Sequence, residues 1–394
     1  MDNKIKGDLT VSYKALNIVL NNFVNDSRVI KECRSINEKL SININVFALH
    51  EQGLKTYEES SHFTIHRFAL KTRSWPKKRP IQLIKYFECF CSMYKKALVL
   101  KPDIVHSHDL NALPISVAIA RKLKIPIIYD AHEYETQVNG LVQGSLWQRS
   151  LSILEKYLIK KTNKVITVSE SIANEYVRLY DIEKPILILN CPPYKSVKKN
   201  NLFCLEFNIP NEHLIFLYQG VLSSGRGLLQ LLEAFKELND KAKHLVVMGD
   251  GELETTVIKY AQENTNIHYK TAVKPDGLLN WTSSADIGFS TIENTGLSDY
   301  YCLPNKLFEY LMAGLPVIVS NLYELKRIVH NYNLGWVLEE NTAEHIKTLI
   351  ESIKKDDVTL YQASISNAIE EFNWEKQEER LLKLYKELLN YSTN

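Results

Sequence analysis

The sequence predicts an α/β protein of two domains, each built on a doubly wound parallel sheet. Short apolar runs alternate with helix-length amphipathic segments along nearly the whole chain, as expected for parallel strands that helices cover on both faces. With 394 residues, the chain is about two to three times as long as an ordinary domain. The alternation breaks where Pro192 and Pro193 precede a lysine-rich polar stretch, so we place a hinge at residues 190–201.

The predicted N-terminal domain comprises residues 1–192. Its apolar runs predict strands at residues 15–20, 44–49, 103–108, 126–132 and 164–169. Amphipathic segments predict helices at residues 27–40, 113–123 and 146–161. Because helices separate these strands, we expect the strands to be parallel.

The predicted C-terminal domain, residues 193–371, repeats this pattern. Its strands are predicted at residues 213–220, 244–251, 266–273, 285–292 and 315–321. The last segment, residues 372–394, contains a helix with leucines and Tyr385 at helical spacing. Its apolar stripe needs a partner, so we expect this helix to return across the domains. Ligands bind at the carboxyl ends of strands in open parallel sheets, so two facing domains predict a cleft.

Composition and charge narrow the functional classes. The hydrophobic and charged fractions are those of a globular protein, and a net charge of +2 gives no general attraction to nucleic acid. We find no apolar signal core and no run near the roughly 20 apolar residues that span a bilayer. We therefore expect a cytoplasmic protein, with association at the inner face of the cell membrane left open. The 6 cysteines lack paired spacing, which speaks against a zinc site or disulfide framework.

A glycine-bearing loop, GVLSSGRG, leads from a predicted strand into a helix. Backbone amides at such a helix start can bind phosphate, and Arg226 adds a planar fork of donors. Gly220 and Gly225 have the spacing of a Walker A loop, but Arg226 and Gly227 replace its lysine and its magnesium-binding hydroxyl. A P-loop nucleotidase is therefore disfavoured, while a plain glycine turn with a surface arginine remains an equal alternative.

The stretch PNKLFEYLMAG predicts a short helix with a lysine in its first turn. Lys306 would lie at the positive end of the helix dipole, where a cation is unfavourable unless an anion shares the space. A salt bridge to Glu309 would contribute only about 0.2 to 0.5 kcal/mol. A nucleotide diphosphate explains both residues better, because the helix start and Lys306 would face the phosphates and Glu309 the ribose.

An ordered series of motifs resembles one known family. The motifs are DSRVIKECRSI, DIVHSHD, PIIYDAHE, GVLSSGRG, VVMGDGELE, SADIGF and LPNKLFEYLMAGLPVIVSN. In this order they resemble the retaining GT-B glycosyltransferases, glycosyltransferase family four (group 1 glycosyltransferases), over nearly the whole chain. The resemblance implies two Rossmann-like domains facing across a cleft. It also implies metal-independent sugar transfer, without a cofactor, from a UDP- or GDP-linked nucleotide sugar to a saccharide or lipid-linked acceptor, in surface polysaccharide or glycolipid biosynthesis.

The resemblance also assigns roles to residues. His132 matches a histidine beside the donor sugar, Glu309 matches a glutamate that holds the ribose, and these two are the predicted catalytic residues. Arg226 falls at or near the basic position that faces the diphosphate, and the backbone near Val273 falls where relatives bind the base. The predicted donor-binding residues are Gly220, Arg226, Val273, Asn305, Lys306 and Glu309.

The chain departs from the family pattern at three positions. Tyr301 stands eight positions before Glu309, where a first glutamate that contacts the donor sugar is expected. Pro304 replaces a loop glycine, and Val221 replaces an arginine that often follows the glycine of the other loop. These departures leave the sugar open, while Lys306 would supply the missing charge at the phosphates.

Polar residues that follow two N-terminal strands form the predicted acceptor side. They are His108, Asp109 and Glu133. A metal site formed by His106, His108 and Asp109 is an alternative, but two histidines on one strand and one carboxylate are a weak signal. We favour acceptor contacts, or helix capping by Asp109, over a metal.

A basic cluster precedes an amphipathic segment in the N-terminal half. It contains Trp75, Lys77, Lys78 and Arg79. A core helix with a basic entry loop is the simpler interpretation. Contact with a membrane surface is the functional alternative, and it would suit a lipid-linked acceptor.

Two other functional classes stay open. A nucleotide-sugar epimerase or hydrolase on the same fold would convert the donor without an acceptor. A binding-only relative without catalytic activity would fit Tyr301, although Arg226, Lys306 and Glu309 argue against it.

Overall fold

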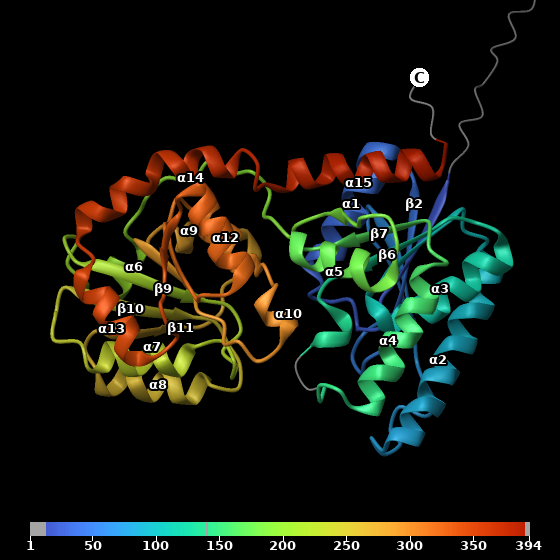
Figure 1. Ribbon diagram of the computed structural model, residues 1–394, viewed down its shortest axis with the longest axis horizontal. Coiled ribbons are helices and arrows are strands. Elements are labelled where there is room, and N and C mark those ends of the chain that lie inside the picture. Colours follow the sequence, from blue (N-terminus) through green and yellow to red (C-terminus); the bar gives the residue numbers. More distant parts are fainter. Residues whose placement is uncertain (1–12, 139–140, 391–394) are drawn as a thin grey trace, which may run out of the picture.

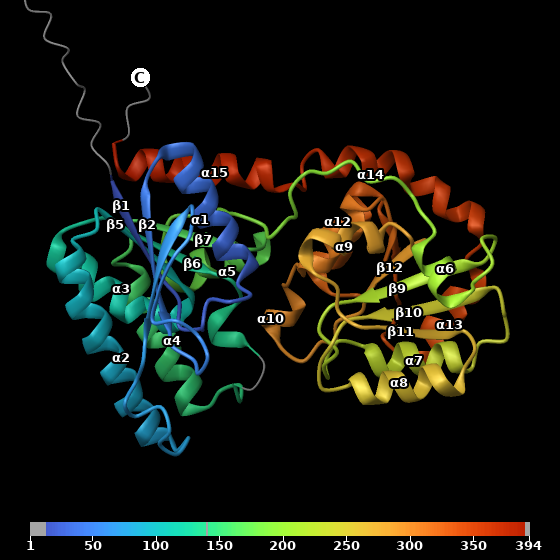
Figure 2. The same ribbon diagram turned by 180° about the vertical axis from the view of Figure 1, so that it is seen from behind.

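The computed structural model describes residues 13–138 and 141–390, which form two α/β domains side by side (Figures 1 and 2). Residues 1–12, 139–140 and 391–394 lie outside the described residues, and they include the outermost ends of the predicted first and last segments. The two sheets confirm the predicted α/β class with two domains.

The N-terminal domain contains an eight-stranded sheet in the order β3-β4-β2-β1-β5-β6-β7-β8. Its strands are β1 (Lys14–Ile18), β2 (Asn43–Leu49), β3 (Tyr57–Glu59), β4 (Phe63–Phe68), β5 (Ile104–His108), β6 (Ile127–Ala131), β7 (Lys164–Thr167) and β8 (Ile186–Leu187). Among the described strands of this sheet, only β3 and β4 pair in antiparallel fashion. The sequence did not predict β3 and β4, because β3 is wholly exposed and β4 is only partly buried, so neither forms an apolar run.

Helices cover both faces of this sheet. They are α1 (Ser27–Leu40), α2 (Arg79–Leu100), α3 (Asp109–Leu123), α4 (Leu146–Ile159), α5 (Glu170–Tyr180) and the short 3-10 helix η1 (Glu135–Gln137). Asp26 caps α1 by accepting a hydrogen bond from the Val29 amide. The loop from β1 to α1 is thereby held at the carboxyl edge of the sheet.

The C-terminal domain contains a six-stranded parallel sheet in the order β11-β10-β9-β12-β13-β14. Its strands are β9 (Leu214–Gln219), β10 (Lys243–Met248), β11 (Ile267–Lys270), β12 (Ile287–Ser290), β13 (Val317–Val319) and β14 (Gly335–Val337). Its helices are α6 (Leu202–Phe207), α7 (Leu228–Lys236), α8 (Glu254–Glu263), α9 (Pro275–Thr282), α10 (Leu297–Tyr300), α11 (Asn305–Met312), α12 (Tyr323–Tyr332), α13 (Ala343–Ser352), η2 (Lys355–Tyr361) and α14 (Gln362–Ile369).

The last helix, α15 (Trp374–Leu388), returns from the C-terminal domain to the N-terminal domain (Figure 1). Trp374, Leu381 and Tyr385 are buried in the same cluster as the apolar face of α1. The indole of Trp374 also donates a hydrogen bond to Ser35 Oγ at 2.9 Å. The predicted return of the final helix is confirmed, and it supplies the partner that its apolar stripe requires.

Among the described residues, no helix combines the length and the apolar character that crossing a bilayer requires.

Candidate functional site

A cavity of about 890 Å³ lies between the two domains, and both contribute to its walls. The N-terminal wall consists of the loop from β1 to α1 and the residues after β6. The C-terminal wall consists of the end of β9, the loop before α7, and the segment from α10 into α11. The cavity thus lies beyond carboxyl ends of strands from both sheets, as open α/β sheets predict.

Most of the predicted site residues line this cavity. They are His132, Glu133, Gly220, Arg226, Asn305, Lys306 and Glu309. His108, Asp109 and Val273 do not line it. His108 is buried behind His132, and Val273 packs against the C-terminal core.

Lys306 lies in the first turn of α11, and its ammonium faces an aromatic ring. Its Nζ is 3.8 Å from the ring centroid of Tyr218, and a side chain on Gly220 would approach Lys306 Cε at 3.7 Å. Burial lowers the pKa of Lys306 to about 7, Arg226 lowers it further, and Glu309 only partly offsets these effects. The cavity therefore holds a lysine whose cationic form still lacks an adequate counter-charge.

Glu309 does not pair with Lys306. Its carboxylate accepts a hydrogen bond of 2.6 Å from Gln219 Nε2, and Gln219 Oε1 accepts one of 2.8 Å from Thr282. Burial raises the pKa of Glu309, while the hydrogen bond from Gln219 opposes that rise. The salt bridge to Lys306, which the sequence did not favour, is not formed. Instead, Thr282 of α9 donates to Gln219 of β9, and Gln219 in turn donates to Glu309 and orients its carboxylate.

The glycine loop before α7 carries Arg226 on its exposed side. The Gly225 carbonyl accepts from the Glu293 amide at 3.0 Å, and the Ser224 amide donates to Glu252 at 2.7 Å. Gly227 has a φ of 68°, and a side chain there would meet the Thr291 carbonyl at 2.3 Å. The loop backbone is fixed while the guanidinium of Arg226 faces the cavity.

His132 lies between two carboxylates on the opposite wall. Its Nδ1 is 3.4 Å from Asp109 Oδ1, and its Nε2 is 3.4 Å from Asp130 Oδ2. Burial opposes a charge on the imidazole, but Asp109 and Asp130 outweigh burial and raise the pKa of His132 to about 9. A positively charged imidazole is therefore favoured at neutral pH, with 19% of the side chain exposed at the cavity.

Asp130 is buried and held by Arg28 of α1. The Arg28 guanidinium donates to both carboxylate oxygens of Asp130 at 2.9 Å and to the Ile188 carbonyl at 2.8 Å. Burial works against the charge of Asp130, but Arg28 keeps the pKa of Asp130 well below its ordinary value. The neighbouring Glu32 is also buried, and burial together with Asp130 raises its pKa to about 8.

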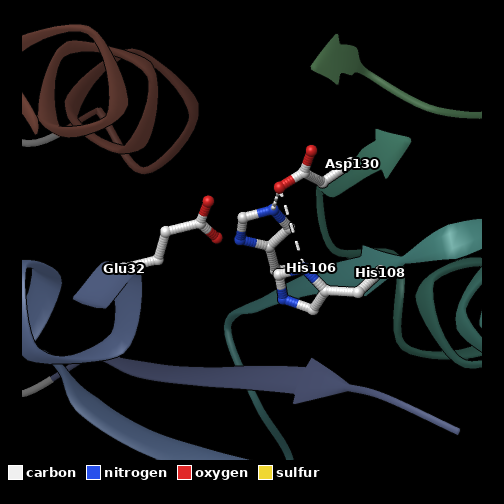
Figure 3. A group of neighbouring side chains, drawn as sticks. All are labelled: Glu32, His106, His108 and Asp130. Carbon is white, nitrogen blue, oxygen red and sulfur yellow. Dashed lines mark ion pairs between the residues drawn. The ribbon is translucent and has the colours of Figure 1, made fainter. Parts of the chain in front are cut away.

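Four buried side chains of this region come close enough to resemble a metal site (Figure 3). They are Glu32, His106, His108 and Asp130, whose nearest ligand atoms lie within 4.8 Å of one another. Asp130 is committed to Arg28, and the two ring nitrogens of His108 contact Asn17 and His132. His106 Nδ1 contacts the Tyr385 hydroxyl.

Too few ligand atoms remain for a divalent cation. His106 Nε2 and the Glu32 carboxyl oxygens are the cluster atoms without a hydrogen-bond partner among the described residues. Tetrahedral zinc requires three or four protein ligands. The guanidinium of Arg28 would also repel the ion, since it lies 3.1 Å from Glu32. The cluster fits the role of a buried support for His132 better than that of a cation site.

Sequence reasoning missed Arg28, Asp130 and Asp299. Arg28 and Asp130 belong to the motifs DSRVIKE and YDAHE, but their pairing depends on the fold. Asp299, on α10, lines the cavity and accepts a hydrogen bond of 2.6 Å from Thr295. A carboxylate close to the unusual Tyr301 is the sequence signal that could have identified it.

Tyr301 itself does not line the cavity. Its ring lies 5.3 Å from that of Tyr300 and 6.1 Å from that of Tyr323, and it packs against the core of the N-terminal domain. Tyr301 therefore contributes to the contact between the domains.

Two family models match the chain. The model described as Glycosyltransferase Family 4 matches residues 38–192, and the model described as Glycosyl transferases group 1 matches residues 205–388. A glycogen synthase from Mycobacterium tuberculosis is 21% identical over 70% of this chain, and the match spans 66% of its length, just under two thirds. A UDP-Gal:alpha-D-GlcNAc-diphosphoundecaprenol alpha-1,3-galactosyltransferase from Escherichia coli is 24% identical over 78% of this chain and 81% of its own.

Solved structures share the whole fold. A sucrose-phosphate synthase from Thermosynechococcus elongatus aligns with a TM-score of 0.78 at 16% identity, covering 96% of this chain and 100% of its own. HepE from Anabaena, in complex with UDP-glucose, aligns with a TM-score of 0.71 at 14% identity, covering 95% of this chain and 100% of its own. The predicted GT-B arrangement is confirmed by these alignments.

Proposed function

The chain belongs to the group 1 glycosyltransferases of glycosyltransferase family 4, and from this premise we propose a retaining, metal-independent sugar transfer from a nucleotide-diphosphate sugar to a hydroxyl acceptor. The observation that most directly supports this proposal is the pair of basic residues on the C-terminal wall of the cavity. Lys306, in the first turn of α11, and Arg226, in the loop before α7, both line this wall, and the N-terminus of α11 adds further positive potential. A diphosphate supplies the negative charge that this wall lacks.

The proposed chemistry follows from where charge develops. The bond between the anomeric carbon and the donor phosphate oxygen breaks, and negative charge accumulates on the leaving diphosphate near Lys306 and Arg226. The acceptor oxygen forms the new bond from the same face, and its proton passes to the departing phosphate oxygen. In this proposal His132, which lines the opposite wall, orients the donor sugar, and its positive charge stabilises the leaving diphosphate electrostatically.

Two relatives support the choice of substrates. The HepE structure was solved with UDP-glucose, which favours a UDP-linked donor, with a GDP-linked donor as the alternative. The Escherichia coli relative is named for a sugar on diphosphoundecaprenol, which favours a lipid-linked saccharide as the acceptor. A role in polysaccharide or glycolipid biosynthesis follows from these choices. A cytoplasmic location remains a prediction.

The membrane contact expected near Trp75 also remains a proposal. Trp75, Lys77 and Lys78 are exposed in the loop before α2, while the side chain of Arg79 lies outside the described part of the chain.

We propose that Asp299 supplies the carboxylate that Tyr301 does not. Asp299 lies two positions before Tyr301, is largely buried, and lines the cavity beside the start of α11. A carboxylate there can accept hydrogen bonds from sugar hydroxyls. Asp299→Asn removes the negative charge but keeps the shape of the side chain. Because the proposed contact is to the sugar hydroxyls, this variant should change the preference among nucleotide sugars more than the affinity for free UDP.

The decisive test is a binding and turnover screen. Thermal shift and product formation are measured with UDP- and GDP-linked sugars, with and without lipid-linked and saccharide acceptors. Lys306→Ala and Glu309→Ala should each weaken nucleotide binding by about ten- to a hundredfold, since each removes a charged contact. Lys259→Ala, an exposed lysine on α8, is the matched control.

Each alternative class has its own outcome in this screen. Donor conversion without an acceptor would identify an epimerase or hydrolase. Nucleotide-sugar binding without turnover under any acceptor would identify a binding-only protein. If no nucleotide sugar binds, the proposal fails.

A further inference from the structure

Helix α4 exposes large apolar side chains on its outer face. Its inner face is mixed, because Gln148 and Glu155 are buried beside Leu158 and Ile159, which belong to the core. A helix on the surface of a globular domain normally keeps polar side chains on its outer face. Packing within this domain therefore explains the inner face of α4 but not the apolar outer face.

The inward polar residues are fully engaged. Glu155 is completely buried and accepts hydrogen bonds from the hydroxyls of Tyr129, Tyr176 and Tyr180. Gln148 donates to the Thr136 carbonyl at 3.0 Å. These contacts fix the rotation of α4 about its axis, so the apolar face cannot turn inward without breaking them.

The outward apolar residues form one continuous stripe. Leu146, Ile153 and Tyr157 follow helical spacing, and Trp147 and Leu154 widen the stripe on one side. Their exposed fractions are 81% for Leu146, 69% for Ile153 and 61% for Tyr157. An exposed stripe of this size on one helix marks an interaction surface.

Positive charge borders the stripe along its other side. Arg149 and Lys156 are exposed on α4, and Lys161 lies over the Tyr157 ring at 3.6 Å. Lys160, which directly follows the helix, is also exposed, and its Nζ lies 3.9 Å from Asp181. The only acidic residue of the helix, Glu155, faces inward. An apolar stripe with a basic border matches the interface of a bilayer that carries anionic headgroups, where the charges meet phosphates and the apolar side chains enter the acyl boundary.

A second apolar group lies at the same end of the domain. Leu83, Ile84 and Phe87 of α2 are exposed, and they follow Trp75, Lys77 and Lys78 in the chain. In both views the N-terminal ends of α2 and α4 lie at the same end of the N-terminal domain (Figures 1 and 2).

We propose that the outward face of α4 docks the protein on an anionic lipid bilayer. The occupant is a lipid surface and not a second copy of this chain, because a copy would bring the same basic border against itself, whereas anionic headgroups complement it. The inference deepens the proposed function, since it would place the N-terminal wall of the cavity near a lipid-linked acceptor, and it rests on that function only for this purpose.

Vesicle sedimentation tests the proposal without donor or acceptor. The full chain is mixed with vesicles of phosphatidylcholine alone or with about one third phosphatidylglycerol, at low and high salt. We expect binding to the anionic vesicles, weakened by salt. Ile153→Ser with Tyr157→Ser should lower the partition coefficient by about tenfold or more, because two exposed apolar anchors are lost. Arg149→Gln with Lys156→Gln should weaken the salt dependence, since two of the basic residues that border the stripe lose their charge.

Matched variants on the C-terminal domain control for general surface effects. Leu205 and Leu360 have exposed fractions of 68% and 69%, so Leu205→Ser with Leu360→Ser changes similar apolar area away from α4 and should leave binding unchanged. The thermal shift caused by UDP, measured on every variant, shows that the cavity is intact and separates failure of docking from failure of the proposed function.

Three outcomes would overturn the proposal. The first is that the wild-type chain stays in solution when mixed with anionic vesicles at low salt. The second is that the Ile153→Ser, Tyr157→Ser variant binds the vesicles as well as the wild type. The third is that the chain does not bind vesicles but forms a dimer in light scattering, and that Ile153→Ser with Tyr157→Ser dissociates this dimer. That result would assign the outward face of α4 to contact with a second copy of the chain.

Discussion

The imidazole of His132 gains its charge from Asp109 and Asp130, neither of which lines the cavity. Asp130 lies behind it and is itself fixed by Arg28. A carboxylate that is paired on its other side cannot neutralise the imidazole by taking its proton, so it acts as a fixed negative potential. Asp130 is therefore a positioning residue, whereas His132 lines the cavity, as does part of Arg28.

This assignment predicts a change in the pH profile. Since the folded pKa of His132 is about 9, wild-type activity that depends on the charged imidazole should decline as pH rises through that value. Asp109→Asn removes one of the two carboxylates at a partly exposed position, so the decline should move to lower pH. The measurement is kcat against pH at saturating nucleotide sugar and acceptor, because a bound diphosphate would raise the pKa of Lys306 and keep its titration out of this profile. An unchanged profile would contradict the assignment.

Glu32 predicts a second pH effect, on stability. Its folded pKa of about 8 lies above the unfolded value, so the folded state binds more protons between about pH 4.5 and 8. Stability from this group is present at low pH and is lost as pH rises through that window. Glu32→Gln should abolish this loss, a difference on the order of 3 kcal/mol between pH 5 and 8.

Urea unfolding of the wild type and Glu32→Gln at both pH values measures this difference. Glu339→Gln, an exposed carboxylate, is the control and should keep the wild-type slope. Equal slopes for the wild type and Glu32→Gln would show that Glu32 is ionised in the folded state.

At the scale of elements, the cavity wall depends on the junction of β9, the loop before α7, and α11. The positive φ of Gly220 lets the chain turn away from β9 while Lys306 packs alongside. The Tyr310 hydroxyl accepts from the Gln219 amide at 2.9 Å and donates to the Phe289 carbonyl at 3.1 Å. These bonds tie α11 to two strands, so its first turn presents Lys306 and Asn305 to the cavity.

This junction predicts proton uptake on nucleotide binding. The pKa of Lys306 is about 7 without an anion, and a bound diphosphate would raise it. Between about pH 7 and 8.5, UDP binding should therefore take up a fraction of a proton. Titration calorimetry in buffers of different ionisation enthalpy measures this uptake. Lys306→Met should remove it and weaken UDP binding by about tenfold, whereas Lys259→Met should not.

Many of the strands and helices could be predicted from the sequence, and the contacts that could not be predicted were missed for physical reasons. Buried parallel strands form apolar runs, so β1, β2, β5, β6 and β7 were predictable, and so was the lysine in the first turn of α11. Sequence spacing cannot reveal pairs that the fold assembles across more than a hundred residues, such as Arg28 with Asp130. The same pattern predicted α4 as a helix, but the hydroxyls that draw Glu155 inward come from β6 and α5.

At the scale of the whole molecule, a few contacts hold the domains in the observed arrangement. The Glu324 carboxylate of α12 accepts a hydrogen bond of 2.7 Å from the Ser171 amide at the start of α5. The Tyr134 amide donates to Ser298 at 3.3 Å, and Tyr301 packs against the N-terminal core. The hinge segment, residues 190–201, is tied to α15, since the Trp374 amide donates to the Pro192 carbonyl at 2.9 Å. Movement between the domains must therefore break the contacts near the cavity while α15 keeps its place.

The buried carboxylate of Glu324 is the contact whose removal best tests this view. It lies at the positive end of α5, where its charge is favourable, and Arg327 holds it from its own helix. Glu324→Ala should favour an open arrangement, raise the radius of gyration measured by X-ray scattering, and lower kcat/KM by about tenfold through lost domain closure. Glu324→Gln keeps an oxygen acceptor for the Ser171 amide, so its effects should be smaller. If both variants match the wild type in scattering and turnover, Glu324 does not control the arrangement, and the packing of Tyr301 against the N-terminal core becomes the next contact to test.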